Sequence, residues 1–251
     1  MWNEWSRRSF MSALAATALG PSTGWAFGAR GRFHVAELDV PGGSLHRPQA
    51  WERMLHEIIQ ATSVEADAKV VRVSPEDQSL FEHPFAVLVG QKALPEVSDE
   101  AVHQLRRFIS YGGFLLFDDA SGTGTGGYAE SVRRLTQRIF PTRPLSPLPG
   151  DHAVYRSFFL LDTPVGRTRG TGVLEGVQLG PTTPLVFCPC DLSGALDRST
   201  DGRNKLPLAG GELQRREATK LAINLALYAL TSNYKHDIAH VVELMREGRL
   251  E

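Results

Sequence analysis

Four stretches of the chain carry the hydrophobic pattern of β-strands. Phe33–Val40 alternates apolar and polar residues and then meets a turn, Pro41-Gly42-Gly43, and Lys69–Val73 is a second short strand. Phe85–Gly90 and Phe114–Phe117 are continuously apolar, which is typical of strands buried on both faces of a parallel sheet. The pattern therefore predicts a sheet whose central strands are fully buried.

Helical periodicity separates these strands. Apolar residues recur every three or four positions after Pro48, after Ser98 and within Tyr128–Phe140, so each segment presents one apolar face. Pro48 suits the first turn of a helix, Ser98 can cap the next one, and Gly112 or Gly113 supplies its stop. The positions expected to face inward are Trp51, Met54, Leu55, Ile58, Ile59, Val102, Leu105, Phe108, Ile109, Val132, Leu135 and Ile139.

The alternation of these elements predicts the order β-α-β-β-α-β-α, which is typical of a doubly wound α/β protein. We therefore expect a flavodoxin-like parallel sheet with helices on both faces. The segment 141–201 is rich in Pro, Gly and Thr and contains strand-like pieces at Val154–Leu161, Gly172–Leu179 and Leu185–Cys190. We interpret it as an inserted β-rich loop region, with a hairpin followed by a return strand.

Two helices are expected at the C-terminal end. Leu213–Leu230 is broadly apolar from Leu221 onward, so we expect it to pack against the sheet. After Thr231 a shorter amphipathic helix is expected within residues 232–251. Its apolar face would carry Ile238, Val241, Val242 and Met245.

The N-terminus resembles a twin-arginine export signal. Ser6-Arg7-Arg8-Ser9-Phe10-Met11 precedes a mildly apolar run from Ser12 to Leu19, and Ala26-Phe27-Gly28 resembles a small-residue cleavage site. The expected organisation is a signal peptide at 1–28, an α/β domain at 29–231 and the C-terminal helix at 232–251. The signal implies a periplasmic or extracytoplasmic protein, and we expect no transmembrane segment beyond the signal.

Charge and cysteine content exclude some classes of protein. Lys and Arg total 27 against 28 for Asp and Glu, so no overall field attracts nucleic acid, and we expect no nucleic-acid partner. The two cysteines, Cys188 and Cys190, are so close in the chain that a mutual disulfide would be strained. The fold is therefore not a disulfide-stapled scaffold, and the role of the pair stays open.

A buried strand that ends on two carboxylates is the strongest functional signal. Asp118 and Asp119 follow Phe114–Phe117, and open α/β sheets bind ligands beyond the carboxyl ends of their strands. Such a pair can bind a hard divalent cation or act as acid and base. Ser121 opens a glycine-rich stretch whose backbone N–H groups can face an anion. The alternative is that the two Asp side chains accept backbone hydrogen bonds that fix the loop.

Two further positions are candidates for the same edge. His152 follows Asp151 after a Pro-rich loop and suits a base or a metal ligand if the fold brings it to the strand ends. A loop-pinning His with a capping Asp explains this pair equally well. Asp191 follows the strand predicted to end at Cys190, so it reaches the edge of Asp118 if that strand is parallel and adjacent. Local hydrogen bonding in a strand-end turn is its other explanation.

Several motifs resemble known families. The segment 33–140 looks like the class I glutamine amidotransferase-like fold, in which an apolar strand, a helix ending in Gly-Gly and a second apolar strand lead to a nucleophile elbow. More closely, four pieces of the chain resemble a bacterial family described as a domain of unknown function (number 4159). The pieces are Phe81-Glu82-His83-Pro84-Phe85, Leu105–Asp119, Asp151-His152 and Asn224–Thr231.

The resemblance has two implications for function. Amidotransferases place a Cys just past the second strand, about where Asp119 stands, so glutaminase activity is not expected. Relatives of the family often occur beside BatA-like membrane proteins, von Willebrand A domains and MoxR-type ATPases, which implies a context of envelope assembly. The leading hypothesis is an exported, non-catalytic domain that binds a ligand or partner at the carboxyl ends of its strands. The alternative is a metal-assisted hydrolase that uses a divalent cation with Asp118, Asp119, His152 and Asp191.

Overall fold

The computed structural model describes residues 32–169 and 172–246, with side chains described up to residue 232. The predicted signal peptide, residues 1–28, lies outside the described residues and stays a prediction. The apolar face predicted beyond Thr231 likewise falls on side chains outside the described set.

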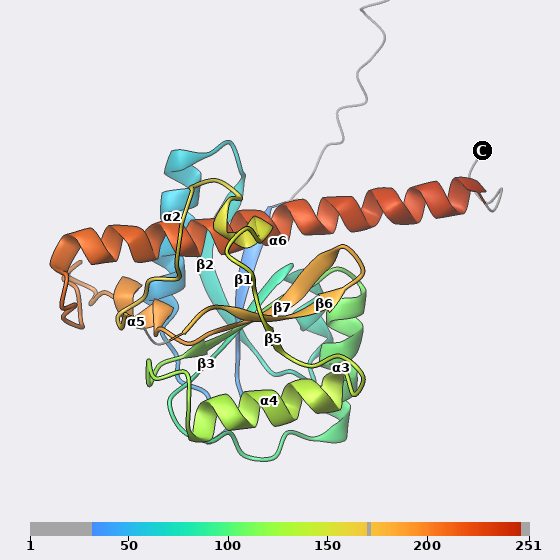
Figure 1. The fold of residues 1–251 in the computed structure, drawn as a ribbon, viewed down its shortest axis with the longest axis horizontal. Coiled ribbons are helices and arrows are strands. Elements are labelled where there is room, and N and C mark those ends of the chain that lie inside the picture. Colours follow the sequence, from blue (N-terminus) through green and yellow to red (C-terminus); the bar gives the residue numbers. More distant parts are fainter. Residues whose placement is uncertain (1–31, 170–171, 247–251) are drawn as a thin grey trace, which may run out of the picture. The chain divides into compact units, whose positions relative to one another are not determined.

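A mixed sheet forms the centre of the fold (Figure 1). Its strands are β1 (Phe33–Leu38), β2 (Ala66–Val73), β3 (Phe85–Gly90), β4 (Phe114–Asp119), β5 (Ser146–Pro147), β6 (Glu175–Leu179) and β7 (Thr182–Cys188). Within the described residues the sheet has seven strands in the order β2-β1-β3-β4-β7-β6-β5. The neighbours from β2 to β7 are parallel, and this order is consistent with the flavodoxin-like class. The prediction of an α/β fold is confirmed.

Helices cover both faces of the sheet. They are α2 (Pro48–Ala61), α3 (Asp99–Ser110), α4 (Gly127–Ile139), α5 (Leu192–Leu196) and α6 (Gly211–Arg246). Apolar residues of α2, α5 and α6 form one buried cluster with the sheet, and those of α3 and α4 form another on the opposite face (Figure 1). None of the helices in the described ranges combines the length and hydropathy that a membrane span requires.

The helix stop and the strand that lead to the candidate site are built as predicted. The Ser98 hydroxyl accepts the N–H of Ala101 at 3.1 Å and so caps α3. Gly112 has a φ of 97°, and a Cβ on Gly113 would lie 2.4 Å from the Phe108 ring, so both positions need glycine. β3 and β4 are buried along their whole length, which confirms the meaning of their continuous apolar runs.

The inserted region differs from the prediction in one of its expected strands. Val154–Leu161 is not a strand, because its first residues belong to a short 3₁₀ helix, Ala153–Tyr155, and the next N–H groups are satisfied by a side chain instead of a ladder. The side-chain oxygen of Asn224, on α6, accepts the N–H groups of Phe158 and Phe159 at 3.2 and 2.8 Å. The expected hairpin is present, because β6 pairs antiparallel with both β5 and β7, and it makes the sheet mixed.

Two helical predictions are wrong. The break expected after Thr231 does not occur, and α6 is one continuous helix to Arg246, because no Gly or Pro interrupts it there. Ile59 of α2 is 41% exposed, whereas Trp51, Met54 and Leu55 are fully buried. The apolar stripe of α2 is therefore narrower than its periodicity suggested.

Candidate functional site

The ends of β4 and β7 meet at one edge of the sheet, which we call the carboxyl edge. Asp118 and Asp119 are the last residues of β4, and Asp118 lies opposite Cys188 in the parallel pairing with β7. β7 ends at Cys188, and Asp191 follows it after Pro189 and Cys190, so Asp191 reaches the same edge, as predicted for an adjacent parallel strand. The structure thus brings three of the predicted site residues together.

His152 lies at the opposite edge. Its Nε2 is 3.0 Å from the hydroxyl of Thr183, at the beginning of β7, whereas Asp191 follows the end of that strand. Five residues of strand span roughly 16 Å. His152 therefore does not share a site with Asp118 or Asp191, and the condition on which its prediction depended is not met.

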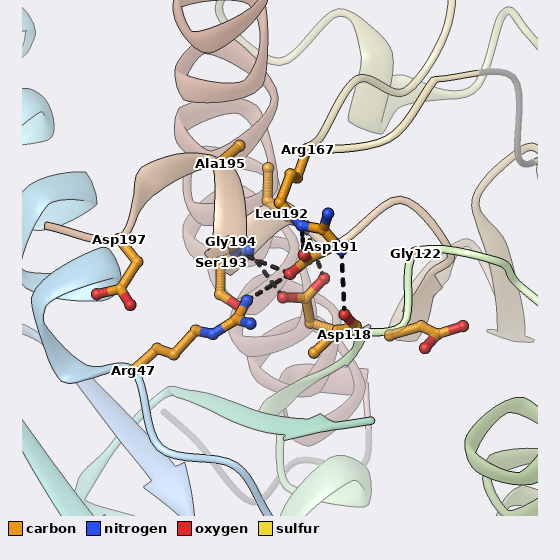
Figure 2. Close-up of polar contacts among 12 residues, drawn as sticks. Arg47, Asp118, Gly122, Arg167, Asp191, Leu192, Ser193, Gly194, Ala195 and Asp197 are labelled. Atoms are coloured by element: carbon orange, nitrogen blue, oxygen red, sulfur yellow. Dashed lines mark hydrogen bonds and ion pairs between the residues drawn. The ribbon is translucent and has the colours of Figure 1, made fainter. Parts of the chain in front are cut away.

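Asp118 is fully buried and anchors the start of α5 (Figure 2). Its two carboxylate oxygens accept the N–H groups of Leu192 and Ser193, each at 2.8 Å. Burial, and then the negative charge of Asp191, raises the pKa of Asp118 to about 6. The side chain that the sequence offered as a cation ligand is instead a tertiary hydrogen-bond acceptor.

Asp191 is the centre of the edge. It is the one non-glycine residue with positive φ in the described chain, at φ 54° and ψ 63°, and its carboxylate accepts the N–H of Gly194 at 2.9 Å. The same carboxylate forms ion pairs with Arg47 and Arg167, which approach it from different segments (Figure 2). A fully buried carboxylate needs such compensation, because desolvating an unpaired charge is strongly unfavourable.

Sequence reasoning missed both arginines. Arg47 stands directly before α2, where its backbone N–H donates to Glu37 Oε1 at 2.8 Å and its side chain also bonds the hydroxyl of Ser193 at 3.1 Å. Arg167 donates its backbone N–H to the carbonyl of Asp191 at 3.0 Å. The sequence could have indicated Arg47, because it ends the loop that joins β1 to α2, and this loop lies at the carboxyl edge. Nothing in the inserted region singles out Arg167.

Asp119 and Ser121 build the loop after β4. One oxygen of Asp119 accepts the N–H and the hydroxyl of Ser121 at 2.9 and 2.6 Å, and the other accepts the N–H of Gly124 at 2.9 Å. Asp119 has no exposed surface, and its oxygens face the loop. This arrangement matches the loop-fixing alternative that the sequence left open. Thr168 then joins the loop to the inserted region, because its hydroxyl donates to the carbonyl of Gly122 at 2.8 Å.

A second pair of carboxylates, Glu37 and Asp39, lies at the end of β1. This pair was not predicted from the sequence. His46 lies between two carboxylates, with Nδ1 3.5 Å from Glu37 Oε2 and Nε2 3.2 Å from Asp39 Oδ1. Glu37 is buried, and burial raises its pKa. The alternation of Phe33–Val40 places Glu37 on the inward face, which is the signal that could have found it.

The carboxyl edge does not fit a divalent cation. The oxygens of Asp118 and Asp119 accept N–H and hydroxyl donors, and those of Asp191 face two guanidinium groups, so a cation would have to displace these partners. Across the residues that the structure describes, no group of three or more His, Cys, Asp or Glu is arranged to hold a metal ion. The donor set of the metal-assisted hydrolase is therefore not assembled.

His152 has a structural role where it lies. Its Nδ1 accepts the N–H of Val154 at 3.2 Å and so caps the 3₁₀ helix. Burial lowers its pKa, with Asp151 opposing the shift, and the neutral ring is the form that can accept this bond. The residue also lines a pocket of about 430 Å³ together with Arg143, Pro149 and Gln178.

Fold and site together define an α/β protein of layered helices and sheet, with strand-end carboxylates that are bound by the protein's own donors. The chain belongs to the family described as "Domain of unknown function (DUF4159)", which matches residues 34–230. No curated protein matches the chain.

Proposed function

We propose that this protein is an exported, non-catalytic domain with an amidotransferase-like fold that binds a protein partner in the cell envelope through its carboxyl edge. The observation that carries the proposal is the state of Asp119, at the position where an amidotransferase would hold its nucleophile. Three donors bind its two oxygens, and the side chain is fully buried. A group held in this way cannot attack a substrate, so its role is to shape the loop that follows.

Neither cysteine supplies a replacement nucleophile. Cys188 and Cys190 are both buried, and contact with the Cys190 thiol, followed by burial, raises the pKa of Cys188 well above its ordinary value. A nucleophilic Cys needs a lowered pKa and access to its substrate. Both thiols are buried and so lack access to a substrate, and neither cysteine can therefore replace the nucleophile that Asp119 does not supply.

The binding surface that we propose consists of Ser121, Thr123, Thr125, Arg167 and Thr168, and we call it the edge surface. Its hydroxyls are ordered in a chain, with Ser121 Oγ 2.8 Å from Thr123 Oγ1, which donates to the carbonyl of Thr125 at 2.9 Å. Thr123 and Thr125 are exposed, and the Arg167 side chain keeps 29% of its surface. A pre-ordered polar loop beside a guanidinium suits a polar or acidic partner, because little entropy is lost on binding.

The partner that we propose comes from the context implied by the family resemblance, which includes BatA-like membrane proteins, von Willebrand A domains and MoxR-type ATPases. The test measures the dissociation constant of the chain from Ala29 onward for a purified BatA-like von Willebrand A domain from the same organism. Thr125→Glu adds a negative charge to the edge surface without removing a described side-chain bond. The expected result is about tenfold weaker binding, equivalent to about 1.4 kcal/mol.

Thr142→Glu is the matched control, since Thr142 is also exposed but follows the end of α4 near the pocket of His152. It is expected to bind as the unchanged chain does. Equal weakening by both substitutions, or no binding by the unchanged chain to any member of the three partner classes, would reject the proposal.

Export is tested separately. Residues 1–28 are fused to a reporter that folds in the cytoplasm, and the cellular fractions are compared with those from a fusion carrying Arg7→Lys with Arg8→Lys. We expect the reporter in the periplasm only with the arginine pair. Equal export of both fusions would reject the twin-arginine route.

A further inference from the structure

Cys188 and Cys190 lie in contact beneath the carboxyl edge. Their Sγ atoms are 3.3 Å apart, and the side chains are 0% and 2% exposed. Both thiols are free. We expected a disulfide between residues this close in the chain to be strained, but the two sulfurs are in contact. They can meet because β7 ends at Cys188 and the chain bends before Asp191, which has a left-handed conformation.

We propose that Cys188 and Cys190 are a reversible dithiol–disulfide pair, and that closing the disulfide loosens the hydrogen bonds that hold α5 and Asp191 at the carboxyl edge. Bond formation shortens the distance between the sulfurs from 3.3 Å to about 2 Å, so one or both residues move by roughly an ångström. This inference does not rest on the proposed function.

The surroundings of the pair transmit such a movement. Cys188 pairs with Asp118 across the parallel strands, and Asp118 holds the N–H groups of Leu192 and Ser193. The carbonyl of Cys190 accepts the N–H of Thr168 at 3.1 Å. Close packing resists small shifts, so a displacement of Cys190 reaches these bonds.

The Cys190 carbonyl also has no free space on its other side. A Cβ on Gly166 would lie 2.1 Å from this oxygen, so the backbone of the inserted region rests directly against it. The side-chain amide of Gln214, on α6, in turn holds the carbonyls of Gly166 and Arg167 at 2.7 and 2.9 Å. The turn is therefore clamped from both sides, and a change at the sulfurs cannot be absorbed without altering a hydrogen bond.

The conversion is a two-electron oxidation in which the oxidant is a small disulfide. During refolding, before the two thiols are buried, the Cys190 thiolate attacks one sulfur of that disulfide and forms a mixed disulfide, and the released thiolate takes up the proton that Cys190 lost. The Cys188 thiolate then attacks the sulfur of Cys190, closes the intrachain bond and expels the second small thiolate, which takes up the remaining proton. One dithiol and one small disulfide thus give one protein disulfide and two small thiols.

The test uses the full chain from Ala29 onward, equilibrated over a range of ratios of reduced to oxidised glutathione. Because the thiols are buried, equilibrium is approached from the reduced protein and from protein refolded under oxidising conditions. Samples are quenched in acid, unfolded, alkylated and weighed. We expect a species two hydrogens lighter and unalkylated, which is replaced by a doubly alkylated species as reduced glutathione rises, with a midpoint independent of protein concentration.

Single variants provide the control for the sulfur chemistry. Cys188→Ser and Cys190→Ser each keep one thiol, and neither is expected to lose the two hydrogens. Two outcomes would overturn the proposal that Cys188 and Cys190 form a disulfide. One is double alkylation of the unchanged chain at every glutathione ratio, and the other is glutathione adducts or linked dimers in place of the species that is two hydrogens lighter.

Hydrogen exchange tests the coupling. In the oxidised chain the N–H groups of Leu192, Ser193 and Thr168 are expected to exchange about tenfold faster, equivalent to about 1.4 kcal/mol of lost protection. The N–H of Ala101, which donates to the capping hydroxyl of Ser98 at the start of α3 on the other face, serves as the reference, and its exchange rate is expected to stay unchanged. Equal protection of Leu192 and Ser193 in both redox states would overturn the coupling even if the disulfide forms.

Discussion

The turns after β4 and β7 end neighbouring strands, yet they are built in opposite ways. The β4 turn, residues 119–126, is held by Asp119, whose partners lie two and five residues further along the chain. The β7 turn, residues 189–194, is held by Asp191, whose arginine partners lie 144 and 24 residues away. The first turn is a local motif, and the second is a point where distant segments are tied together.

The two carboxylates therefore contribute differently to stability. The bonds of Asp119 order an exposed loop, so their loss should change that loop and little else. Asp191 joins the loop before α2, the inserted region and α5, and these elements pack against the sheet on the face that α6 also covers. Its loss should weaken the cooperative unfolding of the whole domain.

Asp191→Ala is expected to have the largest effect. It leaves Arg47 and Arg167 without their buried counter-ion, removes the cap of α5 and places alanine in a left-handed conformation. Removing one partner from a buried ion pair costs about 3–5 kcal/mol, and we expect the free energy of unfolding in urea to fall by about 4 kcal/mol. Asp191→Asn, which keeps the cap and tolerates the conformation, should lose less. A fall below about 1 kcal/mol for the alanine variant would contradict the role of this turn as a tie point.

Asp119→Ala is expected to cost about 2 kcal/mol, because it leaves the N–H groups of Ser121 and Gly124 without their acceptor. Hydrogen exchange should rise at Ser121 and Gly124 while the N–H groups of Leu192 and Ser193 keep their protection. Matched losses in both turns would show that the two are one cooperative unit, and the comparison would then fail.

The pH dependence of stability should report Asp118. Its pKa is raised from 3.8 to about 6 in the folded protein, so the folded state binds a proton more readily than the unfolded state. The stability from this group is fully present below pH 3.8 and is lost as pH rises through about 6. Between about pH 5 and about pH 7.5 we expect the domain to lose about 1.5 kcal/mol relative to Asp118→Asn. Parallel urea titrations of the two proteins over this window measure the difference, and coincident profiles would be the contrary result.

Thr168→Val should have the smallest effect, about 1 kcal/mol, because it removes the single hydroxyl bond that joins the inserted region to the β4 turn. The substitution preserves the shape of the side chain and leaves the backbone bond from Thr168 to Cys190 in place. Thermal unfolding measures the loss, and exchange at Gly124 is expected to rise slightly. A loss as large as that of Asp119→Ala would mean that Thr168, more than Asp119, orders the loop.

Sequence reasoning worked best where a single segment carries its own signal. The continuous apolar runs of β3 and β4 are typical of strands buried on both faces, and the stop at Gly112 has the positive φ that glycine readily adopts. The placement of Asp118 and Asp191 at one edge followed from the parallel pairing of β4 with β7. By contrast, the sequence could not decide whether His152 reaches this edge, because its position depends on how the inserted region folds back.

By itself the sequence determined most of the strands, most helix faces and the carboxylates at the strand ends, because each depends on residues that are neighbours in the chain. Only the tertiary structure decided that Arg47 and Arg167 neutralise Asp191, that Asp118 holds α5, and that the two cysteine thiols touch. The physical reason is that burial of a charge demands a partner without specifying which one. The choice is made by segments that meet only when the sheet and its helices close around them.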